Sequence, residues 1–458
     1  MRRRVVVAGL LLIPLNAWWL AQVEYVRYSD TPTIPSLYFH CVSLLLLLAG
    51  LNAAVRAWRP VGALYPAEML LLYAMLVIAS NLAGHDQLQI LFTTLAWPLY
   101  RATPENRWGE TVLPNLPQWL LPEAWALPPL FSGHASLYAE GHWRAWLLPV
   151  GVWLCVVCTL AFTMFCLMSL LRRQWDHERL TYPLAEVPLA IVQREGSLFA
   201  RPPFWAAFAL AAGLQLLSLA ATFFPTVPVT NLGVRYYPLF QTWPWRAFGT
   251  VPVCFYPFAL GVSFLLPLEV LFSCWLFSLV GRLELVAGAA AGYTNANDFP
   301  FVHQQVAGAF VGFGLCVLWG ARRHLCAAWR RARGAPVPED AQEPLSYRAA
   351  LLGATGGTLV LFAGGVLLGV RPWVAALYLA GLFLIVLTFA RIRAEAGLPS
   401  FGLERYGPDQ VLAQYAGLSG REVGVASLLF FLTRTHRQLP MQNYADAMRL
   451  ADRSGTDQ

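Results

Sequence analysis

The stretch Trp146–Leu171, WLLPVGVWLCVVCTLAFTMFCLMSLL, contains no charged residue and decides the class of protein. A helix that crosses the hydrocarbon core of a bilayer needs about 20 mainly apolar residues, and this run is longer. Seven more long apolar runs follow the same pattern: Val5–Val23, Ile34–Val55, Leu64–Leu82, Phe204–Phe224, Val251–Val280, Ala349–Val370 and Trp373–Ala390. Because backbone inside lipid must satisfy its own hydrogen bonds, the chain is predicted to be an all-α, polytopic helical membrane protein. We expect about 8 to 11 membrane segments, some of them broken or re-entrant.

Composition and charge placement agree with a membrane protein. The chain has 458 residues, of which 57% are hydrophobic and only 12% charged, outside the range of soluble globular proteins. The net charge of +7 does not indicate a nucleic-acid partner, because all 32 basic residues are arginines that lie mainly at the ends of apolar runs. With a cytoplasmic N-terminus, 25 of these arginines, including all from Arg421 onward, fall in cytoplasmic segments, as the positive-inside rule predicts. The count would weaken if Val423–Leu432 crossed the membrane alone.

Loops divide the chain into parts. Trp329–Tyr347 carries charge, Pro and Gly and is predicted to be a cytoplasmic linker between an N-terminal membrane bundle (1–328) and C-terminal membrane segments with a polar tail (348–458). Leu88–Tyr100 is amphipathic and short for a span, so an interfacial or re-entrant segment is expected. The following loop, 100–145, is rich in Pro and Trp, and we expect it to lie on the outer membrane surface.

One apolar run is interrupted by helix breakers. Val251–Val280 contains three prolines and Gly261, and Pro267 is a natural hinge because proline removes a backbone donor and clashes one turn back. We expect a broken or kinked helix here. After it, Leu285–Gly292 and Val302–Trp319 are predicted to form a hairpin that enters from the cytoplasmic side.

Glu269 is the first candidate functional residue. An ionisable group inside an apolar run costs about 2.5–3.5 kcal/mol on insertion scales, so it should face protein or water and have a role. A proton-coupling carboxylate is one interpretation, and a structural carboxylate bonded to a neighbouring helix is the other. The transport interpretation requires that Glu269 does not face lipid.

Other polar residues could form a substrate or proton path. The string with Asn295, Asn297 and Asp298 offers oxygen ligands for a substrate or cation, or is an ordinary polar loop. Glu68 lies one turn into its span, where it has a role or snorkels to the interface. His85 and Asp86 end the third span, as a proton relay or as a solvated helix end.

Two charged strings follow long spans. They are DHERLTYP at Asp176–Pro183 and RIRAEAGLP at Arg391–Pro399. In each, opposite charges stand close where helix becomes loop, which fits a gate or hinge as well as topology anchoring. The candidate gate residues are Arg179, Tyr182, Pro183, Arg391, Arg393 and Glu395, together with the hinge Pro267.

Signatures of soluble enzymes do not occur. The sequence has no phosphate-cradling loop, no dinucleotide fingerprint and no H-E-x-x-H. No catalytic residue, metal ligand or cofactor is therefore predicted, and ATP-driven transport would require a partner ATPase.

Several strings resemble the oligopeptide transporter (OPT) superfamily, specifically an uncharacterised bacterial branch. Leu180–Pro183 is similar to the Leu-Thr-Tyr-Pro motif, although the usual Ser-Gly after it is Leu184-Ala185 here. Leu266–Ser273 resembles the family's broken helix, and Ala102–Trp108 and Arg391–Pro399 resemble strings of the bacterial branch. The resemblance implies a proton-coupled carrier in a bacterial inner membrane, with relatives that move small peptides or metal–chelator complexes.

The leading hypothesis is a secondary transporter of small peptides or related polar solutes. Glu269 would couple the proton, and Asn295 to Asp298 would belong to the ligand site. The expected partners are the lipid bilayer and a small-molecule or peptide substrate, with a homo-oligomer or companion membrane subunit as a further possibility. The alternatives are a membrane-embedded enzyme that acts on a lipid-linked substrate over the Trp-rich loop, and a non-catalytic membrane subunit.

Overall fold

The computed structural model describes residues 3–133, 136–193, 198–228, 232–293, 299–334, 343–403 and 406–454. It is 73% helical with almost no strand. Within these residues, nine helices are long and apolar enough to cross a membrane. The predicted helical class is therefore confirmed, and the apolar helices are compatible with an integral membrane protein.

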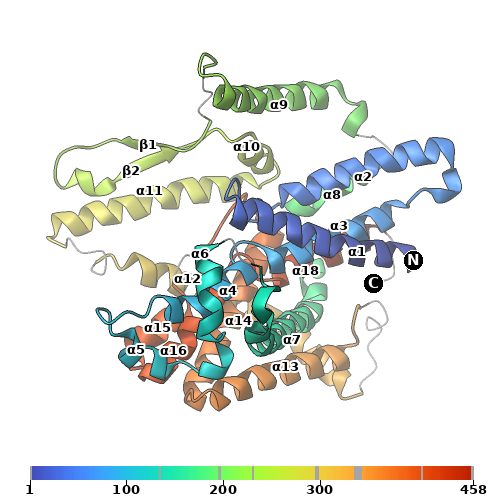
Figure 1. Ribbon diagram of the computed structural model, residues 1–458. Helices are drawn as coiled ribbons and strands as arrows, with labels where there is room; N and C mark the ends of the chain where they lie inside the picture. Colours follow the sequence, from blue (N-terminus) through green and yellow to red (C-terminus); the bar gives the residue numbers. More distant parts are fainter. Residues whose placement is uncertain are drawn as a thin grey trace.

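The helices follow one another as Figure 1 labels them. They are α1 (Arg3–Leu20, continued by a π-helical turn Ala21–Val26), α2 (Phe39–Trp58), α3 (Pro66–Ala83), α4 (Leu88–Tyr100), α5 (Trp108–Thr111), α6 (Leu127–Ser132), α7 (Trp143–His177), α8 (Pro183–Val192), α9 (Pro202–Phe223), α10 (Pro257–Ser263), α11 (Leu268–Ala290), α12 (Val302–Ala332), α13 (Tyr347–Leu367), α14 (Pro372–Glu395), α15 (Pro408–Tyr415), α16 (Gly420–Leu428), α17 (Phe430–Thr433) and α18 (Met441–Ser454). Short 3₁₀ turns lie at Pro60–Gly62, Leu113–Asn115, Gln118–Leu120, Ala124–Ala126, Ala139–Gly141, Leu198–Ala200 and Trp245–Phe248. Strands β1 (Arg235–Pro238) and β2 (Thr250–Val253) form an antiparallel hairpin in which Arg235 pairs with Val253.

Helix α7 organises the bundle. It packs against α12, α13 and α18, and α14 packs against α12, α13 and α18 in turn. Two glycines allow α13 to lie close to α7, because a Cβ at Gly353 would be 2.5 Å from Cys166 Sγ and one at Gly357 would be 2.1 Å from Thr163 Oγ1. Small residues at helix contacts are the usual means of close packing in membrane proteins.

The residues after the expected linker do not form a core of their own. One large apolar core contains residues from α2, α3 and α7 together with residues from α14, α17 and α18. Helix α18, which the sequence suggested as a polar tail, packs against α3, α7, α8 and α14. Helix α12 also continues to Ala332, so it includes the first residues of the expected linker.

The segment after α14 runs along the bundle and back. It leaves α14 at Glu395, whose carbonyl accepts a hydrogen bond from Thr181 just beyond α7. It then reaches the opposite end of α14, where Glu422 in α16 binds Arg371 and α16 contacts the 3₁₀ turn Leu113–Asn115 (Figure 1). It returns as α18, whose Asp452 binds Arg172 near the end of α7.

This path corrects the expectation that every arginine from Arg421 onward shares one side. Arg421 donates to the Leu368 carbonyl and therefore lies at the Arg371 end of the bundle.

Helices α9, α10 and α11 and the β-hairpin lie together along one side of the molecule (Figure 1). None of the residues of α9 is buried, and the buried residues of α11 are only Val286, Gly288 and Ala289. The run Val251–Val280 is not one helix, because proline starts α10 and precedes α11. The expected hairpin after it is also wrong in its first limb, since α11 continues without a break from Leu268 to Ala290.

Candidate functional site

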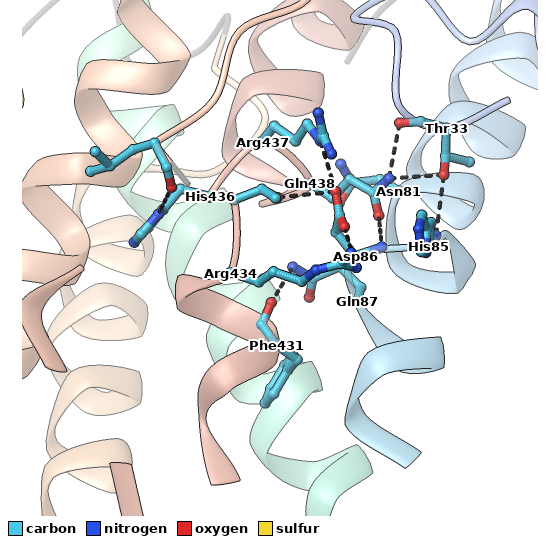
Figure 2. A network of polar contacts seen from close by, with 12 residues as sticks. Thr33, Asn81, His85, Asp86, Gln87, Phe431, Arg434, His436, Arg437 and Gln438 are labelled. Carbon is cyan, nitrogen blue, oxygen red and sulfur yellow. Dashed lines mark hydrogen bonds and ion pairs between the residues drawn. The ribbon is translucent and has the colours of Figure 1, made fainter. Parts of the chain in front are cut away.

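The break between α3 and α4 holds the first polar centre. The side chain of Asp86 is only 1% exposed, and both of its carboxylate oxygens accept hydrogen bonds (Figure 2). Arg434 Nη1 donates to Oδ1 at 2.8 Å, and Oδ2 accepts from Arg437 Nε at 2.7 Å and from Thr435 Oγ1 at 3.0 Å. The amide of Asp86 donates to Gln438 Oε1 at 2.9 Å. The connection between α17 and α18 therefore wraps around one buried carboxylate.

This centre extends to the residues that follow α1 and its π-helical turn. Gln438 Nε2 donates to the carbonyl and the hydroxyl of Thr33 at 2.9 and 2.8 Å. Thr33 donates in turn to the buried Glu24 at 2.6 Å. The amide of His85 donates to Thr33 Oγ1 at 3.2 Å. His85 and Asp86 are thus part of a buried network and do not form a solvated helix end.

A second polar centre lies where α7 and α14 end. Arg172 is 4% exposed and binds Glu343 at 3.2 Å and also Asp452 of α18. Arg173 Nε reaches the other oxygen of Glu343 at 2.7 Å. Burial raises the pKa of Glu343, and the two arginines counteract only part of that effect. These contacts join α7 to α18 and to the residues just before α13.

The two charged strings meet at this second centre. Arg391 binds Glu178 and Glu395, and the Tyr182 amide donates to the Ala394 carbonyl at 2.8 Å. Burial alone would raise the pKa of Glu178, but hydrogen bonds from Gln174 and Arg391 lower it overall.

Close packing continues beyond the strings. Gly397 has a φ of +61°, and a Cβ there would be 2.7 Å from Pro183 Cγ. Arg393 Nε donates to Asp446 Oδ2 at 2.7 Å, and burial raises the pKa of that aspartate despite the ion pair. Arg179 is exposed and has a φ of +58°.

The structure does not bring the other sequence candidates to these centres. Glu68 is buried, and its carboxylate accepts the Tyr65 amide at 3.0 Å in a capping box at the start of α3. Glu269 is exposed in the first turn of α11, where free helix amides favour a carboxylate. A proton-coupling role for Glu269 stays a prediction. Asn295, Asn297 and Asp298 lie outside the described residues.

Two pockets meet at a carboxylate that was not predicted. The α4 pocket has a volume of about 450 Å³ and lies between α4, α15 and α16, with Thr93, Thr94 and Ser427 in its wall. The α7 pocket, about 340 Å³, lies between α7, α13, α14 and α16 and is mostly apolar. Asp409 lines both pockets.

Asp409 is 9% exposed at the start of α15. Its Oδ2 accepts from Thr433 Oγ1 at 3.2 Å. The only sequence signal was a Gly-Pro-Asp helix start, in a helix too short to be noticed as a membrane segment.

The chain matches, over residues 1–458, the family described as "Family of unknown function (DUF6785)". It belongs to this family. No curated protein and no solved structure matches the chain. Within the described residues of this DUF6785 protein, no group of three or more His, Cys, Asp or Glu side chains comes together as a metal site.

Proposed function

We propose that this DUF6785 protein is a proton-coupled secondary transporter that moves small peptides or related polar solutes across a bacterial inner membrane. Its N-terminus would be cytoplasmic, as the distribution of arginines predicts. The resemblance to the oligopeptide transporter superfamily supports the same class of function.

The observation that carries the proposal is the path of residues 396–440. This segment runs between the two ends of the bundle as the short helices α15, α16 and α17, which are joined by non-helical backbone. Such backbone is tolerated at membrane depth only inside protein or beside a cavity. Interrupted helices of this kind form the binding sites of many secondary transporters. We therefore interpret 396–440 as a re-entrant segment and the two pockets at Asp409 as the substrate path.

Both pockets are mostly apolar and have a few polar groups in their walls. The wall of the α4 pocket includes Thr93, Thr94 and Ser427, and the hydroxyls of Thr93 and Ser427 donate to carbonyls of their own helices. Pockets of a few hundred Å³ are the size that small ligands occupy.

The Trp-rich loop does not favour the enzyme alternative. That hypothesis expects two carboxylates within hydrogen-bond reach of each other. In the described part of the loop, Glu110 binds Arg107 at 2.8 Å and Glu123 accepts from the Trp125 indole at 2.7 Å. Each of these carboxylates binds a cation or a donor.

The test is uptake by the full-length protein in proteoliposomes. Radiolabelled di- and tripeptides of mixed charge would be offered under an imposed proton gradient, with empty liposomes and a proton ionophore as controls. We expect accumulation that the ionophore abolishes. Uptake equal to that of empty liposomes for every peptide, with the protein correctly folded, would overturn the proposal.

A further inference from the structure

Gly407 lies next to two buried polar atoms, Asp409 Oδ1 and His436 Nε2. It has an extended backbone (φ −118°, ψ −168°) immediately before α15. A Cβ at this position would be 2.8 Å from Asp409 Oδ1 and 3.0 Å from His436 Nε2. Both atoms therefore border the space that the glycine leaves open, and they are at most about 6 Å apart.

Both side chains are buried and incompletely bonded. Asp409 is 9% exposed and His436 is 1% exposed. Neither Asp409 Oδ1 nor His436 Nε2 has a hydrogen-bond partner in the described part of the chain. Buried polar atoms nearly always have a partner, so two of them at one gap indicate a site that binds something small.

A contact on the far side of the His436 ring shows which ring nitrogen carries the hydrogen. His436 Nδ1 lies 3.1 Å from the Leu403 carbonyl, which can only accept, so Nδ1 carries the hydrogen and Nε2 of the neutral ring is an acceptor. Both side chains are buried, and burial disfavours charge, so the neutral ring and the protonated carboxyl group are the favoured forms. A carboxyl O–H and a bare imidazole nitrogen are complementary.

Other ionisable groups lie around the pair. Tyr378 and Glu422 share the α7 pocket with Asp409. Tyr406 donates to Gln414, and its ring stacks on His303. On the other side, Arg434 and Arg437, which flank His436 in sequence, are bound to Asp86, as described above.

We infer that Asp409 and His436 form a buried proton-binding site, in which the Asp409 carboxyl group holds a proton that it can pass to His436 Nε2 through one water molecule beside Gly407. The proton leaves Oδ1, so the products are a carboxylate and an imidazolium, and no other reactant is required. A separation of up to about 6 Å suits one bridging water with a hydrogen bond to each side. The site would be the coupling group of the transporter. That role rests on the proposed function, but the existence of the proton site does not.

Infrared difference spectroscopy of the full-length protein in proteoliposomes, recorded across a pH titration, tests the site with the proton itself as the probe. We expect the wild type to show the C=O band of a protonated carboxyl group at a pH where exposed carboxyl groups are ionised. Asp409→Asn should remove one component of this band, the part that comes from Asp409, and Asp30→Asn, at an exposed aspartate, should leave the band unchanged. Gly407→Ala should shift the band, because its methyl group would enter the gap, and His436→Gln should shift it through the lost acceptor.

Two results would overturn the site. One is a band that is the same in Asp409→Asn as in the wild type. The other is a band that neither Gly407→Ala nor His436→Gln alters, while size-exclusion profiles show that both variants are folded.

Peptide uptake separates this inference from the proposed function. If the band behaves as expected but the wild type takes up no peptide, the proposed function fails and the proton site stands. If gradient-driven uptake occurs and Asp409→Asn keeps it, the coupling role fails and the transporter stands. If both hold, Asp409→Asn should reduce accumulation to the level seen with the ionophore.

Discussion

Asp86→Asn tests whether the α3–α4 break is fixed by its ion pairs. The substitution keeps the size of the side chain but removes the charge that faces Arg434 and Arg437. Removal of one partner of a buried ion pair costs about 3–5 kcal/mol, because the remaining charge is left unpaired. The side chains of Arg434 and Arg437 are 24% and 16% exposed, so water can recover part of this loss. We therefore expect the free energy of unfolding to fall by about 3 kcal/mol, the lower end of the range.

The assay is reversible unfolding in lipid bicelles, with an exposed ion pair as the matched control. Arg107 and Glu110 are 70% and 69% exposed, so Glu110→Gln should cost about 0–1 kcal/mol. Asp86→Asn combined with Arg437→Gln should cost less than the two single changes together, with a coupling of about 0.5–3 kcal/mol. A loss for Asp86→Asn no larger than that for Glu110→Gln would refute the reasoning.

Three more predictions concern packing, pH and the second polar centre. Gly357→Ala should destabilise the protein by about 1–3 kcal/mol, since the new Cβ would be 2.1 Å from Thr163 Oγ1. Gly356→Ala is the control, because a Cβ there would have nothing within 4 Å, and it should be neutral or slightly stabilising. Thermal unfolding of both variants measures the difference. The hydrogen bond from Arg371 lowers the pKa of Glu422 from 4.5 to about 2, so its stabilisation is complete above about pH 4.5 and is lost as the pH falls through about 2. The stability difference between wild type and Glu422→Gln should shrink over that interval, and a pH-independent difference would contradict the assignment. Arg172→Gln should accelerate hydrogen exchange in α18, because Arg172 binds Asp452 there. Arg453→Gln removes an ion pair of 3.8 Å between half-exposed groups and should change the exchange little. Equal exchange in the two variants would count against the second centre.

The long apolar helices could be predicted from the sequence because length and hydrophobicity are local properties. Each of the eight apolar runs overlaps a helix of spanning length, and Val302–Ala332 supplies the ninth. That Glu269 is exposed could not be predicted, because hydrophobicity alone does not reveal which face of a helix packs against the protein. A carboxylate in the first turn of α11 also has a local stabilising partner in the helix N-terminus, so it does not require a cavity.

The polar centres could not be predicted because their members are far apart in the sequence. Asp86 and Arg437 are separated by 351 positions, and Arg172 and Asp452 by 280. The helices that bring them together are also short, since α15, α16 and α17 have 8, 9 and 4 residues. A segment of that length has no clear period, and its apolar residues look like those of an interfacial loop. His85 and Asp86 were noticed, but nothing near them in the sequence indicated that two distant arginines would bind the aspartate.

The same C-terminal segment joins the two polar centres and the pockets, and this limits how the protein can move. Residues between α17 and α18 bind Asp86, and α18 binds Arg393 and Arg172. Asp409, between these attachments and the end of α14, lines both pockets. A movement that opens the pockets must therefore either break the ion pairs of Asp86 or carry the α3–α4 break with it. His436 belongs to the same connection between α17 and α18 as the two arginines that hold Asp86, although its side chain points away from that carboxylate (Figure 2).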